Sequence, residues 1–323
     1  MRKASMRAEC YFALLLGVAA NAQEVPAILH VEYENQVRYA EDVIDPLRVA
    51  RSSVPVTANP ALNFGRNVDI SDVTAVNGSP AKGVIVNMLS AMLLSPTPAP
   101  GQSISDVSQG QFGFFQIDIL KPNGDRIGSI FAIGGPGTPT GAAIIGGSGA
   151  YVGARGTLNG EAVTGGRPPR NTSQAEDPSM RRTNGVAGRS GYVLRVFPMF
   201  RPEVLVGQNG PVIVHEDYSA ITSAKPARSG EVLILYAKGL GPTTPSVNPG
   251  DLFPGAPFAV VNSPLEVLVN GKAAPAINQI GLPATSDIYH IAFRVPEGTA
   301  AGSATVQISA AWVKGSAVGI PVR

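Results

Sequence analysis

The sequence predicts an all-β protein, and three observations carry that prediction. Gly and Pro supply 37 and 28 of the 323 residues, and both interrupt helix interiors. Hydrophobic residues make up 44% of the chain, which is too apolar for a disordered protein and enough for one large core or two ordinary ones. Short apolar runs lie between Gly, Pro and Asn clusters, the pattern of strands joined by turns.

Residues 1–22 are predicted to be an export signal. A basic start precedes an apolar stretch from Tyr11 to Ala20, which is shorter than the roughly 20 residues that a helix needs to cross a bilayer. The triplet 20–22, Ala-Asn-Ala, fits a cleavage site. We therefore expect a mature chain that begins at Gln23, has no membrane span, and is secreted, periplasmic or held at the cell surface.

Removal of this signal leaves a nearly neutral chain without cysteine. Three basic residues and one acidic residue leave with the signal, so Lys plus Arg and Asp plus Glu both total 22. A nucleic-acid partner is not expected, because such proteins carry a basic excess. Cys10 also leaves, which excludes disulfides and Cys-based metal sites. His30, His215 and His290 lack metal-ligand spacing, so no metal or other cofactor is expected.

Residues 29–200 are predicted to form the first domain. Its clearest hairpin joins 112–120 to 126–133 through Pro122-Asn123-Gly124-Asp125, since Asn-Gly supplies the positive φ angles of a tight turn. In the first of these strands Phe115, Ile117 and Ile119 share one face and the other face is mixed, as in a barrel or a curved sheet. Further strands are expected within 28–44, 84–94, 142–145, 150–158 and 192–200.

The polar segment 159–190 interrupts this pattern. It holds five arginines among Pro, Gly and Asn residues, and Glu161, Glu176 and Asp177 partly neutralise them. We interpret it as a mobile surface loop, with a lid or an anion-binding arm as the alternative.

Residues 144–156 read Ile-Ile-Gly-Gly-Ser-Gly-Ala-Tyr-Val-Gly-Ala-Arg-Gly. This string resembles the glycine-rich strand–turn–strand of the dirigent and allene-oxide-cyclase superfamily. The resemblance covers roughly 29–200 and implies an eight-stranded antiparallel barrel that can bind or cyclise a small apolar molecule. The family's chemical residues cannot be aligned here, so none is carried over. Gly146, Gly147 and Gly149 are expected to permit the turn, and Arg155 to form an ion pair or to cap carbonyls.

Residues 205–323 are predicted to form an immunoglobulin-like sandwich, because several short strands follow one another at regular spacing. Asn270-Gly271 marks a hairpin turn. The expected strands cover 231–237, 265–269, 289–295, 304–313 and 318–322.

This second half also closely resembles a C-terminal module of secreted acidobacterial proteins. That module is thought to be immunoglobulin-like and usually follows other extracellular domains, which implies an accessory or surface role and names no reaction. The residues that carry the resemblance are Gly230–Leu233, Tyr236–Thr243, Asn270–Lys272, Phe293–Pro296 and Gly302–Ile308.

The candidate site residues lie on or beside the hairpins of the first domain. Asp118, Tyr151 and Arg155 are the candidates for catalysis, and Gln116 and Arg126 are those for ligand binding. If the face of Gln116 and Asp118 points into a cavity, the buried carboxylate could act as an acid. If it points outward, these residues are solvated, and the sequence leaves that choice open.

Three functions remain open at this point. The first is a non-catalytic binding or cell-surface interaction protein, whose partner is a small apolar ligand or another extracellular protein. The second is an isomerase or cyclase acting on a small apolar molecule in the barrel. The third is a structural subunit of an extracellular assembly built by edge-strand pairing, and the oligomeric state is open. An apolar cavity with a convergent carboxylate and tyrosine would favour binding or catalysis, whereas a barrel filled by Phe and Ile would favour a structural role.

Overall fold

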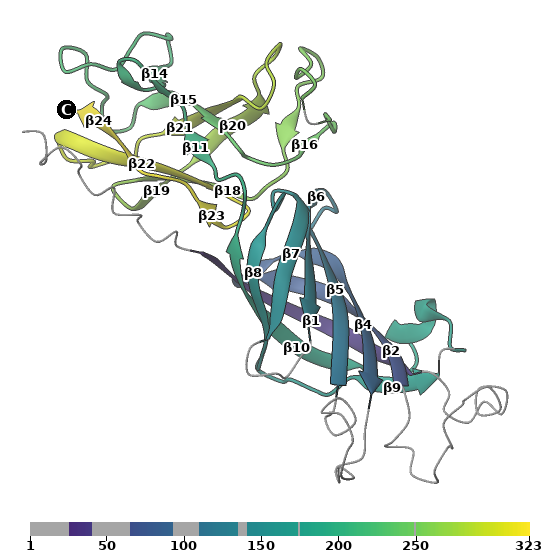
Figure 1. Ribbon diagram of the computed structural model, residues 1–323. Coiled ribbons are helices and arrows are strands. Elements are labelled where there is room, and N and C mark those ends of the chain that lie inside the picture. Colours follow the sequence, from purple (N-terminus) through teal and green to yellow (C-terminus); the bar gives the residue numbers. More distant parts are fainter. Residues whose placement is uncertain (1–25, 41–64, 93–109, 135–140, 174, 249) are drawn as a thin grey trace, which may run out of the picture.

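The computed structural model describes residues 26–40, 65–92, 110–134, 141–173, 175–248 and 250–323 (Figure 1). The predicted export signal, residues 1–22, lies outside them. Within the described ranges the chain is built of β-strands, accompanied by one short 3-10 helix, η3 (Pro178–Arg182). The all-β prediction is confirmed. No helix in these ranges is long and apolar enough to span a membrane.

Eight strands close into an antiparallel barrel, as predicted. Each strand pairs with the next along the chain, and the last one returns to the first. The barrel strands are β1 (Ala27–Ala40), β2 (Gly65–Val76), β4 (Lys82–Met92), β5 (Gly110–Leu120), β6 (Arg126–Gly134), β7 (Ala142–Gly149), β8 (Arg155–Glu161) and β10 (Gly188–Phe197). The short strand β3 (Ser79–Pro80) pairs with β2, and β9 (Arg170–Ser173) runs parallel to β1. Closure leaves the eight strands without a free edge, which removes the usual site of strand addition.

Alternate side chains of these strands fill the barrel interior. Phe115, Ile117 and Ile119 of β5 are fully buried, and Ile117 faces Ile130 of β6 across the pair. The face of β5 that was expected to be apolar is therefore the inner one. Other buried members of the same cluster are Leu29, Val31, Ile85, Ile144, Leu158, Leu194 and Val196.

The bulge in β1 introduces a polar pair among these buried strands. The register shifts between Tyr33 and Gln36, so that Val37 beyond it packs in a separate small cluster. Arg38 then pairs with Asp69 of β2, donating from Nε and Nη2 to the carboxylate at 2.9 and 2.8 Å. Asp69 is only 2% exposed, so the guanidinium supplies the charge that a buried carboxylate needs.

The segment 159–190 is more than the mobile loop that the sequence predicts. It contains the end of β8, then β9 and η3, and the start of β10. Its arginines are held by partners that are distant in sequence, because Asp72 of β2 accepts hydrogen bonds from both Arg181 and Arg182. The other three also have partners: Arg170 with Glu176, Arg189 with Glu32, and Arg167 with the carbonyl of Ala187. Each of the five arginines therefore already has a partner within the protein, which argues against the alternative that this segment binds anions.

Two further sheets enclose a second core. The first runs β11 (Glu203–Val204), β15 (Val232–Lys238), β21 (Tyr289–Arg294), β20 (Ala276–Gly281), β17 (Val260–Val261) and β16 (Thr243–Thr244), with β14 (Ile213–His215) also against β15. The second runs β19 (Lys272–Ala274), β18 (Leu265–Val269), β22 (Gly302–Ala310) and β23 (Val313–Lys314), with β24 (Val318–Val322) against β22. A separate pair is formed by β12 (Val206–Gly207) and β13 (Gly210–Pro211).

Residues of both sheets meet in one buried cluster, which includes Leu233 and Phe293 from the first sheet and Val267 and Ile308 from the second. The predicted Asn270-Gly271 hairpin is confirmed, with φ angles of 48° and 77°. The strand expected over 304–313 is interrupted by a turn at Ala311 and Trp312, which separates β22 from β23.

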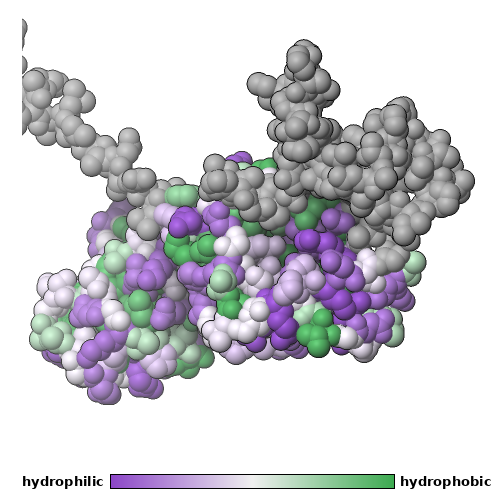
Figure 2. All heavy atoms as spheres, turned by 90° about the horizontal axis from the view of Figure 1, so that it is seen from below, coloured by the Kyte–Doolittle hydropathy of each residue, from purple (hydrophilic) through white to green (hydrophobic). Residues whose placement is uncertain are grey.

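The outer surface mixes hydrophilic and hydrophobic residues. On the face drawn in Figure 2, the hydrophobic residues outside the grey regions form separate patches among hydrophilic ones. The apolar side chains are thus concentrated in the two interior clusters. Single exposed apolar residues are common on protein surfaces. An exposed apolar group indicates a binding site only where several such residues line the same pocket.

Candidate functional site

The two halves of the molecule meet around Tyr151. This residue is fully buried, and its hydroxyl lies 3.5 Å from the carbonyl oxygen of Ala311 at the tip of the β22–β23 hairpin. Ala311 and Val313 belong to the same buried cluster as the barrel core, and Trp312 packs against it. The second half is therefore packed onto the barrel core through this hairpin.

The glycine-rich motif allows this close contact, although its turn lies further along the chain than the sequence predicts. Residues 146–149 are part of β7 and pair with β6, and the turn to β8 falls at 150–154. A Cβ on Gly147 would collide with the backbone of Tyr151, and one on Gly128 would come within 2.9 Å of the Tyr151 ring. The predicted hairpin exists, but these two glycines serve close packing and not the turn.

A pocket of about 520 Å³ lies beside this contact, lined by residues of the β7–β8 turn and of the segments around β16. We call it the junction pocket. The first half contributes Ala150, Val152 and Phe200, and the second contributes residues within 239–248 and 250–253 together with Asp287 and Tyr289. Val152 is 40% exposed and Phe200 is 60% exposed, so apolar surface faces the hollow. The volume is in the range of pockets that hold small molecules.

The charged side chains that line the junction pocket are two carboxylates, Asp251 and Asp287. Asp287 accepts one long hydrogen bond, 3.4 Å from the backbone nitrogen of Gly239, and burial raises the pKa of its carboxyl group. Asp251 accepts a hydrogen bond from the Asn248 amide at 3.0 Å. None of the described lining residues is a lysine or an arginine. The pocket therefore carries negative charge that its own wall does not neutralise.

Tyr289 completes the floor of the junction pocket. Its ring lies 5.1 Å from that of Phe253, and its hydroxyl donates to the carbonyl of Gly241 at 2.7 Å. Burial raises the pKa of Tyr289, so the phenol stays protonated. Asp287 itself has a φ of 55°, a left-handed conformation that costs about 1 kcal/mol for a residue with a Cβ.

Three of the five candidate residues from the sequence lie on the face of the barrel wall opposite its core. Asp118 and Gln116 alternate with the buried Ile117, so their side chains point away from the interior. Ser129 donates to Asp118 at 2.5 Å, Gln116 donates to it at 3.0 Å, and Arg126 lies 3.7 Å from it. The group forms a local polar network and does not face a barrel cavity.

The other two candidates, Tyr151 and Arg155, hold the β7–β8 turn. Burial raises the pKa of Tyr151, and its ring lies between the two halves. Arg155 donates to the carbonyl oxygens of Ile145, Gly153 and Ala154 at 3.1 to 3.3 Å, which confirms the expected carbonyl capping. The five candidates therefore do not converge on one site.

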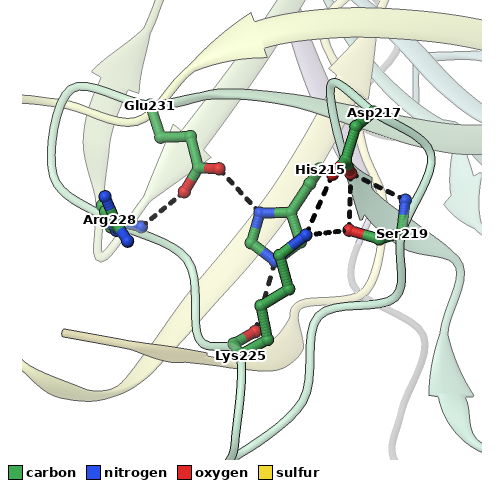
Figure 3. Close-up of polar contacts among 6 residues, drawn as sticks. All are labelled: His215, Asp217, Ser219, Lys225, Arg228 and Glu231. Carbon is green, nitrogen blue, oxygen red and sulfur yellow. Dashed lines mark hydrogen bonds and ion pairs between the residues drawn. The ribbon is translucent and has the colours of Figure 1, made fainter.

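A second polar cluster surrounds His215 (Figure 3). Its Nδ1 lies 2.6 Å from Glu231, and its Nε2 lies 3.2 Å from the carbonyl oxygen of Lys225. Asp217 binds Ser219 and the Lys225 ammonium on the other side of the ring. His215 is only 4% exposed. Both ring nitrogens are occupied, so the cluster ties β14 to the loop before β15.

The remaining histidines also have structural surroundings. His30 lies 2.8 Å from Glu161, and the ring of His290 packs edge-on against Tyr236. Burial lowers the pKa of His290. Over the described residues, no group of three or more His, Cys, Asp or Glu side chains could hold a metal ion.

Sequence reasoning did not single out Phe200, Asp251, Asp287 or Tyr289 as site residues. They come from segments that are far apart in the chain, so no local motif joins them. Both acids lie in segments rich in Gly, Pro, Ser and Thr, a composition that predicts loops and does not mark a site.

Comparison of the chain with models of protein families, with curated proteins and with solved structures gave no match. The two family resemblances therefore stay predictions.

Proposed function

We propose that the chain is a secreted, non-catalytic binding protein whose ligand occupies the junction pocket. The observation that carries this proposal is the combination of about 520 Å³ of space, exposed apolar wall and a convergent carboxylate and tyrosine. This is the combination expected of a binding site, and it occurs beside the barrel instead of inside it.

In this proposal the barrel, which resembles those of the dirigent superfamily, serves as a scaffold. Apolar side chains such as Phe115, Ile117 and Leu29 fill much of its described interior, which argues against a substrate chamber for an isomerase or cyclase. Asp118 and Tyr151, the proposed acid and phenol of such an enzyme, lie on separate faces. The second half, as an immunoglobulin-like module, supplies the loops that form the other wall of the pocket.

Titration with a neutral fluorescent probe, N-phenylnaphthylamine, tests the proposal. Val152→Trp places a larger side chain in the hollow, and we expect it to weaken probe binding by about tenfold or more. The matched control is Val206→Trp, because Val206 is 68% exposed and lies outside the pocket lining. Equal probe binding by the wild type and both variants would contradict the proposed site.

A further inference from the structure

The geometry points to a ligand class: we propose that the junction pocket binds an organic cation, an ammonium or guanidinium group on an apolar stem. This inference rests on the proposed function, because it names the chemistry of the ligand in the same pocket.

The charge of the pocket is one-sided. Asp251 and Asp287 are its charged lining residues, and no basic residue lines it within the described chain. Lys238 lies close enough to lower the pKa of Asp287 slightly, but its ammonium already pairs with Glu203 at 3.2 Å. An anionic ligand would meet two carboxylates and no countercharge, whereas a cation would meet an open partner.

Asp287 is poorly satisfied by the protein. The structure gives its carboxylate one hydrogen bond, from the Gly239 backbone at 3.4 Å, which is beyond the usual 2.7–3.2 Å range of such bonds. Asp287 is an exposed residue, so its carboxylate is open to a ligand; partial loss of hydration is the largest influence on its pKa, and it acts against the charged form. A cation beside the carboxylate would offset that loss of hydration with a charge-assisted hydrogen bond.

Aromatic side chains provide the second half of the recognition. Phe200, which is 60% exposed, is the accessible aromatic ring of the pocket, whereas Tyr289 and Phe253 are only 4% and 6% exposed. The faces of such rings attract ammonium and guanidinium groups. Val152 and Val247 offer apolar contact for a stem. The Tyr289 hydroxyl already donates to Gly241, so it is not free to donate to an anion.

The same chemistry can arrive on a small amine or on a lysine or arginine side chain of another protein. An isosteric series separates the charge from the shape: phenylbutylammonium, phenylbutanol and phenylbutyrate, titrated by calorimetry near neutral pH. A short unstructured peptide with one central lysine, and the same peptide with norleucine in its place, form the second arm. We expect the ammonium to bind about tenfold tighter than the alcohol, with the carboxylate weakest. Tighter binding of the lysine peptide than of the ammonium would assign the pocket to a protein partner.

Asp287→Asn tests the carboxylate itself. Asn tolerates the left-handed backbone at this position, so the change removes charge with little effect on the fold. We expect it to abolish the preference for the ammonium over the alcohol. Glu266→Gln is the matched control, because Glu266 is an exposed acid of β18 outside the pocket lining, and the preference should persist in it.

The outcomes separate the two proposals. If the alcohol binds as tightly as the ammonium, or if Asp287→Asn retains the preference, the cation inference is wrong and the binding function stands. If the ammonium fails to bind while the neutral probe binds, the same conclusion follows. If the neutral probe also fails to bind, the proposed function falls together with the inference.

Discussion

The barrel interior and the junction pocket both place a carboxylate beside aromatic and apolar side chains, but they satisfy it differently. Asp69 in the barrel is 2% exposed and receives two hydrogen bonds from Arg38, at 2.9 and 2.8 Å. Asp287 in the pocket receives one long bond from a backbone nitrogen. The barrel has neutralised its own charge, whereas the pocket has not. Burial alone therefore does not mark a binding site, and an unneutralised charge next to open aromatic surface is the better sign.

The largest expected effect is on stability, and it distinguishes the packed barrel core from the exposed lining of the junction pocket. Phe115→Ala should lower the free energy of unfolding by about 3–5 kcal/mol, because the fully buried ring would leave a cavity. Phe200→Ala should change it by no more than about 0.5 kcal/mol, because Phe200 is 60% exposed. Urea unfolding followed by the fluorescence of Trp312, the only tryptophan, measures both. Equal losses in the two variants would remove the distinction between the regions.

The next effect concerns the neutralised carboxylate. Arg38→Met should lower the free energy of unfolding by about 2–3 kcal/mol, because Asp69 would stay buried without its countercharge. This expected loss of stability is at or below the smallest losses typical of a broken buried ion pair, because the Arg38 side chain is 34% exposed. The double variant Arg38→Met, Asp69→Leu should recover part of the loss in the same urea experiment. A double variant less stable than Arg38→Met would show that the pair does not behave as a neutralised unit.

The smallest effect concerns the segment 159–190. A hydrogen bond from Arg170 lowers the pKa of Glu176 from 4.5 to about 2. A carboxyl group with a lowered pKa in the folded state stabilises it above the unfolded value and loses that effect as the pH falls. We therefore expect hydrogen-exchange protection of β9 and η3 to fall as the pH drops from 4.5 towards 2. Glu176→Gln should show weakened protection already at neutral pH and little further change in that window; a wild-type-like pH profile would contradict this role.

Much of the fold follows from local sequence pattern. Alternation identified the inner face of β5, and the Asn-Gly pairs located two turns. The strand β2 was not predicted, because its alternating pattern is the reverse of the usual one. The polar residues Asp69 and Ser71 are buried, whereas the apolar residues Val68 and Ile70 pack against a separate small cluster. The segment 159–190 was misjudged because its arginines pair with Asp72 and Glu32, partners that no sequence spacing reveals.

The candidate site was harder to predict than the fold. Asp118, Tyr151 and Arg155 were candidates because they lie on or beside the predicted hairpins, and the last two belong to the glycine-rich motif of residues 144–156. That motif turned out to organise the contact between the halves, through Tyr151 and the glycines beneath it. The pocket residues come together only after both halves have folded and packed, so their proximity is a tertiary property.

The position of Ala311 and Val313 in the barrel cluster has a consequence for biosynthesis. All eight barrel strands have been synthesised once β10 has been translated. The apolar surface around Tyr151 nevertheless stays exposed to solvent until the β22–β23 hairpin has been translated much later. During that interval the nascent chain exposes an apolar surface that promotes aggregation, and a chaperone would have to cover it. A circular permutant that is translated from β15 onward would make the hairpin first and remove the interval.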